Sequence, residues 1–412
     1  MSPMYRPSRA VLGASVAALT MLAATACGPD NSDPVVARTT APTVAAGATG
    51  KPGAAPIKLP TAEELKTWKF EDWDKWAQQN VITPAVKGYW TLQRILNAKP
   101  KPMPQPQPQP DPTQPPAQPT GAAPAQPTSK PATPAPAQPT TAQPPSTGDA
   151  LPTVIEAKPT QHPFAKNLHV NGKLFFKDGN EDYVCSGTVV SDPANPGKSN
   201  LVWTASHCLN GGKGGQYYTN ISFAPAYNSN GLLSGGKQAN ETDAEPYGEW
   251  GATAGMVSPQ WSAEADPEHG GPWSQYDFGI IKVANPSGNG KSLEETVGGS
   301  VPIWFNAPRE QFNSVSAYGY PAGKPFDGVE LDHCDSGKPA KKTSDPSRPA
   351  MLMIGCNMTG GSSGGGWVAT KDGKPALVSD TSIGNGASTW EAGPYLDDVA
   401  ARMFDYFSKK SK

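Results

Sequence analysis

The stretch at 359–367 places two serines inside a run of glycines, in the order Thr-Gly-Gly-Ser-Ser-Gly-Gly-Gly-Trp. Glycines on both sides of a serine permit tight or left-handed turns and let a second backbone approach closely. A serine in such a turn presents its hydroxyl to a cleft, where neighbouring N–H groups are free to bind a developing oxyanion. A flexible glycine-serine linker has the same composition. By itself the stretch leaves a catalytic turn and a linker equally open.

A histidine ends an apolar run at 201–208, Leu-Val-Trp-Thr-Ala-Ser-His-Cys. Imidazole exchanges protons near neutral pH, so His207 at the end of a predicted strand is a candidate general base. A lone histidine is more often structural. The other histidines of the chain, however, lie in polar, loop-like settings: His162, His169, His269 and His333.

An aspartate precedes an apolar strand at 276–283, Tyr-Asp-Phe-Gly-Ile-Ile-Lys-Val. A carboxylate in this position tends to be buried and must then find hydrogen-bond donors. The alternative for Asp277 is a turn residue at the start of a strand. The three segments together hold a hydroxyl, an imidazole and a carboxylate, the set that nucleophilic catalysis by serine requires.

These segments resemble those of the chymotrypsin-like (trypsin-fold) serine proteases, most closely the secreted bacterial trypsin-like and glutamyl-endopeptidase-like members. The matching motifs are Thr-Ala-Ser-His-Cys at 204–208, Asp-Phe-Gly-Ile-Ile at 277–281 and Gly-Ser-Ser-Gly-Gly at 361–365. They occur in that family's order of His, Asp and Ser. The resemblance covers about 164–407, and it implies a cofactor-free serine endopeptidase that binds protein or peptide substrates.

The resemblance implies a role for each of these residues. His207 is the expected general base, Asp277 the residue that orients its imidazole, and Ser363 the expected nucleophile. Ser362 fits less well, because the family pattern has glycine two residues before the nucleophile and at both positions after it. The N–H groups of Gly361 and Ser363 are the expected oxyanion hole.

The sequence also departs from the family pattern. Ser362 stands where trypsin-like zymogens carry an aspartate, so we expect no activation through an ion pair with a new N-terminus. Gly366 replaces a usual proline and is expected to loosen the turn. Asn357, Met358 and Ser379 are the residues predicted to line the specificity pocket.

The five cysteines indicate disulfides and one odd thiol. Four of them lie in the C-terminal part and can pair as neighbours, Cys185–Cys208 and Cys334–Cys356, although the sequence does not decide the pairing. The first pair matches a disulfide that braces the histidine loop in many family members. No zinc-type spacing occurs, so we predict no metal. The remaining cysteine is Cys27.

The N-terminus is typical of an export signal. Arg6 and Arg9 precede an apolar run at 11–25 that is short for a membrane span, and Ala24-Thr25-Ala26 is a small-residue cleavage site. Cys27 follows at once and resembles the acylated cysteine of a bacterial lipobox, although Ala24 is weaker there than the usual leucine. The alternative is ordinary signal cleavage that leaves a free thiol. We expect a lipid-anchored cell-surface protein or a secreted one.

Composition separates the 412-residue chain into parts. The chain has 47 prolines, which are densest between 100 and 159, and its net charge of −2 gives no case for nucleic acid binding. Thr61 to Glu64 has the form of a capping box before Trp-rich helical spacing, which indicates either a small helical hairpin or a pro-segment. The predicted parts are a signal peptide (1–26), a disordered tether (27–60), a small Trp-rich helical segment (61–98), a Pro/Gln/Ala/Thr-rich linker (99–160) and the protease domain (161–412).

Short apolar runs between turns predict an all-β barrel or sandwich. The resemblance to the trypsin-fold proteases implies two six-stranded antiparallel β-barrels. A period of four residues at 394–408 adds a C-terminal helix, and the Pro-rich stretch predicts a disordered stalk before the domain. We expect a monomeric serine endopeptidase that is exported and tethered at the cell surface. The alternative is a protease-fold binding or scaffolding protein of the cell envelope that has lost turnover.

Overall fold

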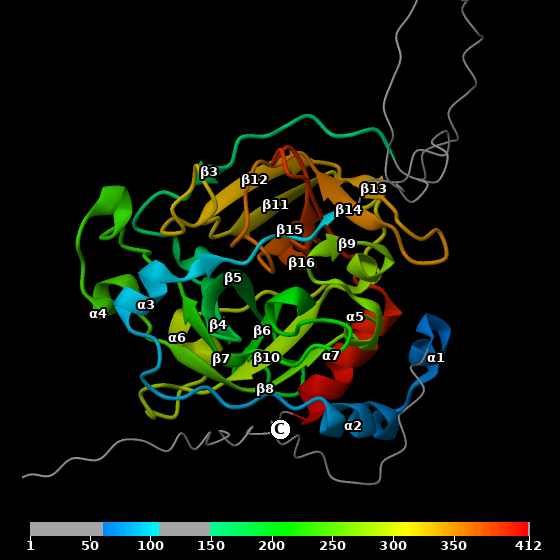
Figure 1. The fold of residues 1–412 in the computed structure, drawn as a ribbon, viewed down its shortest axis with the longest axis horizontal. Coiled ribbons are helices and arrows are strands. Elements are labelled where there is room, and N and C mark those ends of the chain that lie inside the picture. Colours follow the sequence, from blue (N-terminus) through cyan, green and yellow to red (C-terminus); the bar gives the residue numbers. More distant parts are fainter. Residues whose placement is uncertain (1–60, 107–148, 411–412) are drawn as a thin grey trace, which may run out of the picture. The chain divides into compact units, whose positions relative to one another are not determined.

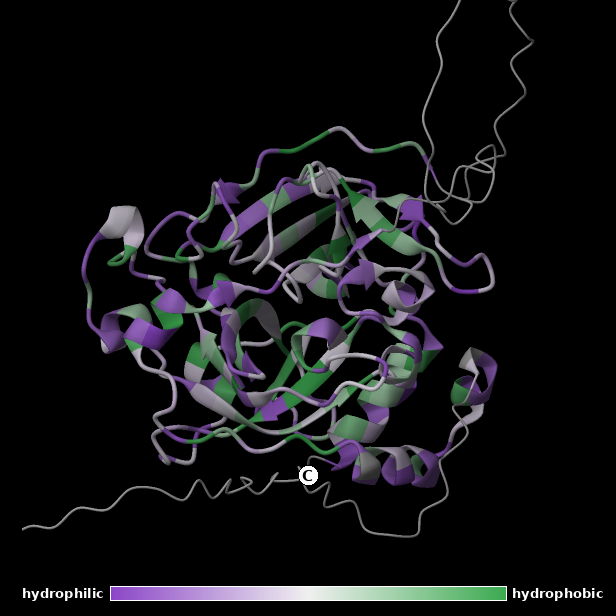
Figure 2. Cartoon of the chain, in the orientation of Figure 1, coloured by the Kyte–Doolittle hydropathy of each residue, from purple (hydrophilic) through white to green (hydrophobic). Residues whose placement is uncertain are grey.

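The computed structural model describes residues 61–106 and 149–410. The predicted signal peptide at 1–26, the tether at 27–60 and Cys27 lie outside these residues. Figure 1 shows two halves built mainly of strands, and Figure 2 shows hydrophobic residues gathered in the strands and hydrophilic ones on outer helices and loops. Among the described residues, no helix is long and apolar enough to cross a membrane.

The first half is a closed barrel of six antiparallel strands in the order β5-β4-β7-β8-β10-β6, closed by pairing of β5 with β6. This confirms the predicted all-β class. Strand β10 shows why the pattern folds this way, since its run Gly-Ile-Ile-Lys-Val buries all but the lysine. The strands are β4 (Asn171–Asp178), β5 (Glu181–Val190), β6 (Leu201–Thr204), β7 (Thr219–Pro225), β8 (Trp250–Val257) and β10 (Gly279–Val283).

The second half consists of two antiparallel sheets, in the orders β16-β15-β11-β12-β3 and β13-β14-β18-β17. No pairing among the described strands joins the sheets, so the second closed barrel that we predicted is not shown. A common apolar core holds them together instead, with Leu352 of one sheet and Trp367 of the other. The strands are β3 (Lys158–Pro159), β11 (Ser314–Gly319), β12 (Asp332–Gly337), β13 (Ala340–Lys342), β14 (Met351–Ile354), β15 (Gly366–Lys371), β16 (Lys374–Asp380), β17 (Ile383–Gly384) and β18 (Glu391–Gly393).

The predicted C-terminal helix is α7 (Asp398–Lys410). It buries Val399, Met403 and Phe407, three of the residues whose spacing predicted it, in the core of the barrel. The shorter helices of the domain are α4 (Glu241–Ala244), α5 (Pro259–Glu264) and α6 (Leu293–Val297).

The Trp-rich segment forms α1 (Ala62–Thr67), α2 (Phe70–Gln79) and α3 (Leu92–Asn97). The capping box of Thr61 and Glu64 is present. The helix α3 begins only after Thr91, whose hydroxyl caps it, and not at Pro84. The segment is no isolated hairpin, since Trp73 and Trp76 join the barrel core.

Both ends of the Pro-rich stretch lie against the domain. Near its start, β1 (Lys99–Pro100) pairs in parallel with β5, and β2 (Gln105–Pro106) pairs in parallel with β9 (His269–Gly270). At its end, β3 pairs with β12. The described residues of the predicted linker are therefore held by the domain at both ends.

Candidate active site

The predicted general base lies on a braced turn between two barrel strands. Strand β6 ends at Thr204, and a single turn of 3₁₀ helix then carries Ser206, His207 and Cys208. A disulfide joins Cys208 to Cys185 of β5, and the hydroxyl of Ser206 donates to the carbonyl of Phe278, 2.6 Å away. This turn is therefore fixed to β5 on one side and to the start of β10 on the other.

Asp277 holds the imidazole of His207 in one orientation. Its Oδ1 accepts the backbone N–H of His207 at 2.9 Å, and its Oδ2 lies 2.7 Å from His207 Nδ1. The hydroxyl of Ser382 donates to the same Oδ2 at 2.6 Å. Both His207 and Asp277 are fully buried. Because a carboxylate accepts, the proton of the neutral imidazole belongs on Nδ1, and Nε2 keeps its lone pair.

The glycine-serine run folds as a tight turn and is not a linker. Gly361 has φ +102°, and a Cβ on it would lie 2.7 Å from the carbonyl oxygen of Tyr320. Gly364 has φ +78°, and a Cβ there would collide with the hydroxyl of Thr204. The carbonyl of Ser363 accepts the N–H of Ser186 from β5 at 2.7 Å. The turn thereby lies against the barrel that carries His207.

The two adjacent serines differ in their hydrogen bonds. Ser362 Oγ lies 2.9 Å from the carbonyl of Thr359 and 3.1 Å from Glu391 Oε1. Ser363 Oγ, although buried, has no hydrogen-bond partner among the described residues. The Nε2 of His207 is likewise buried and without a partner. Of these two serines, Ser363 is therefore the one with an uncommitted hydroxyl, and its role as the nucleophile stays a prediction.

Two backbone N–H groups of this turn are also uncommitted. Within the described chain, neither Gly361 nor Ser363 donates its backbone N–H to another group. The peptides that carry these two N–H groups are held in orientation, because the carbonyl of Gly360 accepts the N–H of Ala322 at 2.8 Å and the carbonyl of Ser362 accepts the N–H of Gly365 at 3.0 Å. The carbonyl of Gly361 accepts the hydroxyl of Ser186 at 2.8 Å. Ser186 Oγ in turn accepts the N–H of Tyr320. A pair of fixed, unpaired donors can stabilise an oxyanion.

Two solved structures are similar to this chain over almost their whole length. The thermostable serine protease AL20 from an extremophilic microorganism is 32% identical, and the match covers 60% of this chain and 99% of that one, with a TM-score of 0.47. Protease Anisep from Arthrobacter nicotinovorans is 35% identical, covering 61% and 97%, with a TM-score of 0.46. The chain belongs to the trypsin-fold serine proteases. No family model and no curated protein matches it.

A third solved structure, a Glu endopeptidase, matches this trypsin-fold protease at 16% identity over 63% of this chain and all of that one, with a TM-score of 0.44. The unmatched part of the present protein is in each case more than a third of its length. Nothing in these matches therefore accounts for that share of the chain.

The chain also has a buried acid beside the serine turn that the sequence did not single out. Glu391 on β18 is fully buried, and its pKa is raised to about 8 by burial, against the opposing effect of hydrogen bonds from Ser362 and Thr381. The acid thus contacts Ser362, which stands where zymogens carry an aspartate. No sequence motif marks Glu391 as part of the site, because it lies in a Trp-Glu-Ala-Gly stretch far along the chain from the serine turn.

The side chains predicted to line the specificity pocket make other contacts within the fold. Asn357 Oδ1 accepts the N–H of Ala157 at 2.7 Å, and Ser379 Oγ donates to the carbonyl of Pro394 at 2.8 Å. Met358 is buried in the core of the second half. Their assignment to a pocket stays a prediction.

Two further expectations have clear outcomes. Cys334 and Cys356 form the second disulfide, as neighbour pairing predicted. Gly366 does not loosen the turn, because its N–H donates to Thr188 Oγ1 at 3.2 Å, and a Cβ on it would crowd the same hydroxyl. Proline has no N–H and would lose this bond.

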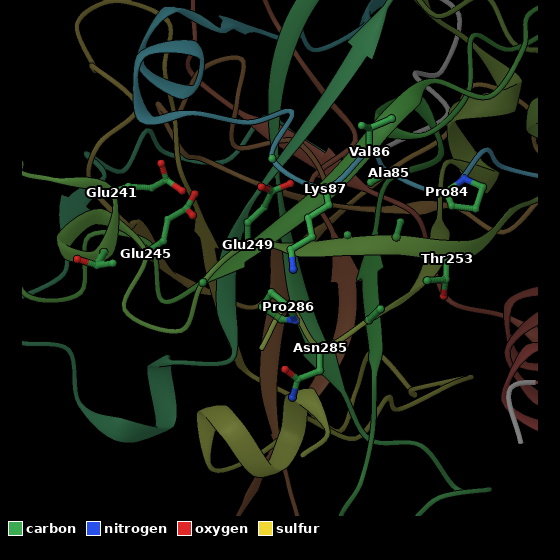
Figure 3. A pocket seen from close by; sticks show the side chains of 16 residues that line it. Pro84, Ala85, Val86, Lys87, Glu241, Glu245, Glu249, Thr253, Asn285 and Pro286 are labelled. Carbon is green, nitrogen blue, oxygen red and sulfur yellow. The ribbon is translucent and has the colours of Figure 1, made fainter. Parts of the chain in front are cut away.

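Further groupings of titratable or metal-ligating side chains occur in the domain. Among the described residues, Cys185, His207 and Cys208 have metal-ligand spacing, but the two sulfurs are joined in the disulfide. A cavity of about 480 Å³ lies between the 84–88 segment and β8, and its lining includes Lys87, Glu241, Glu245 and Glu249 (Figure 3). None of the predicted site residues lines it.

Proposed function

We propose that this protein is a serine endopeptidase that hydrolyses peptide bonds through an acyl-enzyme, exported and tethered at the cell surface. The observation that carries the proposal is that two buried atoms, a serine hydroxyl and an imidazole nitrogen, are both uncommitted. Among the described residues, Ser363 Oγ and His207 Nε2 have no hydrogen-bond partner, while Asp277 holds the other imidazole nitrogen. Such an arrangement lets a serine lose its proton as it attacks a carbonyl.

In this mechanism Ser363 Oγ attacks the substrate carbonyl and its proton passes to His207 Nε2. The N–H groups of Gly361 and Ser363 bind the resulting oxyanion. The tetrahedral intermediate collapses, the C–N bond breaks, and the amine leaves with the proton from His207. Water then enters, gives a proton to His207 and attacks the acyl-enzyme, which releases the carboxylic acid and regenerates Ser363. Asp277 stabilises the imidazolium in both halves of the cycle.

A fluorophosphonate probe tests the nucleophile directly. We expect the exported chain to carry the label on Ser363, located by peptide mass, and Ser363→Ala to lose it. Peptide hydrolysis by that variant should fall by on the order of 10⁶-fold. Ser362→Ala is the matched control, and its label should remain on Ser363. A label on Ser362, or equal labelling of Ser363→Ala, contradicts the proposal.

The location at the cell surface rests on two separate observations. The two disulfides indicate an exported protein, because disulfides persist in oxidising compartments. The lipid anchor at Cys27 is inferred from the sequence alone, from its place directly after the small-residue cleavage site.

A further inference from the structure

The candidate nucleophile is covered. Ser363 and His207 are both 0% exposed, although a nucleophile and its base must reach a substrate. The segment 99–106 passes between the two halves of the domain, and Figure 1 shows it in cyan, running from α3 toward β9. The contacts of this segment identify where it lies.

Its first part is added to the edge of the barrel beside the serine turn. β1 pairs with β5 at Tyr183 and Val184, and the N–H of Lys101 donates to the carbonyl of Val184 at 3.0 Å. Two residues further along β5, Ser186 donates its N–H to the carbonyl of Ser363. The segment therefore joins the same strand that holds the serine turn.

The side chain of Lys101 anchors this end. Its ammonium group lies 3.1 Å from Asp178 Oδ2 and 4.9 and 4.8 Å from the ring centres of Tyr183 and Tyr218. Lys101 is only 9% exposed. A cation held by a carboxylate and two aromatic faces makes a specific contact, unlike the loose contacts of a flexible spacer.

The middle and end of the segment lie against the second half. A Cβ on Gly360, next to Gly361, would be 2.7 Å from the carbonyl oxygen of Lys101. Met103 is 8% exposed and reaches Gly384, where a Cβ would lie 3.0 Å from its methyl group. Gly384 is two residues beyond Ser382, the hydroxyl donor to Asp277. The segment thus crosses from the β5 side to the Asp277 side of the site.

We propose that residues 99–106 occupy the substrate cleft and block access to Ser363, so that the chain is made in an autoinhibited form. This inference rests on the proposed peptidase function. The alternation Lys-Pro-Lys-Pro-Met-Pro-Gln-Pro suits the task, because proline fixes an extended backbone before it binds and so lowers the entropic cost of ordering. The occupant of the cleft is a segment of this chain, and the side chains of Lys101 and Met103 hold it in place.

The test measures fluorophosphonate labelling of Ser363 in the exported full chain and in Lys101→Glu and Met103→Asp. The first change places a carboxylate against Asp178, and the second places one against Gly384. Both variants should label about tenfold faster or more, since the burial of one such side chain shifts an equilibrium by one to two powers of ten. Val86→Asp, a change at an exposed residue of the same N-terminal extension, is the control and should label at the wild-type rate.

Hydrogen exchange of peptides covering 99–106 supplies an independent measurement. Slow exchange of the Lys101 amide in the wild type, and faster exchange in the two variants, supports the inference. Equal labelling of all four proteins with free exchange at 99–106 overturns it and leaves the peptidase function intact. If none of the four proteins is labelled, the peptidase function is contradicted instead. Hydrogen exchange at 99–106 then shows whether the segment is held against the domain.

Discussion

Two buried carboxylates near the serine turn differ in their surroundings. Asp277 has three donors, from the backbone and ring of His207 and the hydroxyl of Ser382. Glu391 receives hydroxyl hydrogen bonds on one side, while its Oε2 is buried without a partner among the described residues. Burial therefore dominates at Glu391 and raises its pKa to about 8.

The raised pKa of Glu391 predicts a pH-dependent stability. The folded state keeps a proton that the unfolded state, with a pKa of 4.5, releases. The contribution of this group to the free energy of unfolding is therefore complete below 4.5 and is lost as the pH rises to about 8. Glu391→Gln cannot ionise, so its free energy of unfolding should fall less than that of the wild type across this window. Urea denaturation at several pH values measures the difference.

The exposed Glu310→Gln is the matched control, and its stability should run parallel to the wild type at every pH. A Glu391→Gln profile that also runs parallel would show that the carboxyl of Glu391 has the same pKa in both states.

At the scale of elements, the N-terminal helices are part of the domain core. Trp73 of α2 is 2% exposed and stacks on Tyr406 of α7, with ring centres 6.5 Å apart. The hydroxyl of Tyr406 donates to Asp74 at 2.9 Å. The helix α2 therefore covers the outer face of α7, and the inner face of α7 packs on the barrel.

Removing this contact should destabilise the whole protein. We expect Trp73→Ala to lower the free energy of unfolding by about 3–5 kcal/mol, the usual cost of removing a large buried aromatic. Lys75→Ala, at an exposed position on the same helix, should change it by less than about 0.5 kcal/mol. Chemical denaturation of the full chain measures both. A small effect of Trp73→Ala would mean that α2 does not share the core of the barrel.

At the scale of the whole molecule, the chain combines a protease fold with a proposed restraint and a predicted attachment. The described parts on both sides of the Pro-rich stretch are fixed to the domain, through β1 and β2 on one side and β3 on the other. In the proposal of a lipid anchor at Cys27, residues 28–60 link the membrane to the domain.

The anchor makes a direct prediction about location. Wild-type protein expressed in a bacterial host with lipoprotein processing should be found in the membrane fraction, and Cys27→Ser should be released into the medium. Cell fractionation with an antibody to the domain measures the ratio. The control is Ser32→Ala in the same polar stretch, which should stay with the membrane. Release of the wild type itself would favour ordinary signal cleavage.

Local motifs made much of the site predictable. The glycines around Ser363, the small-residue turn before His207 and the cysteine beside it are each contained within a few residues, because positive φ and close backbone approach demand glycine at defined places. The four-residue period of α7 is local in the same way. The roles of these residues in catalysis remain a proposal that rests on their geometry.

What only the tertiary structure decided depends on contacts between distant segments. Ser382 as a donor to Asp277, and Glu391 beside Ser362, come from strands that no spacing rule relates. The two unjoined sheets of the second half were missed because short apolar runs are alike whether or not a barrel closes. The sequence by itself determined that 99–106 is an extended, proline-alternating chain. The position of 99–106 across the site depends on the surfaces of β5, the serine turn and β17, and these surfaces exist only once the domain has folded.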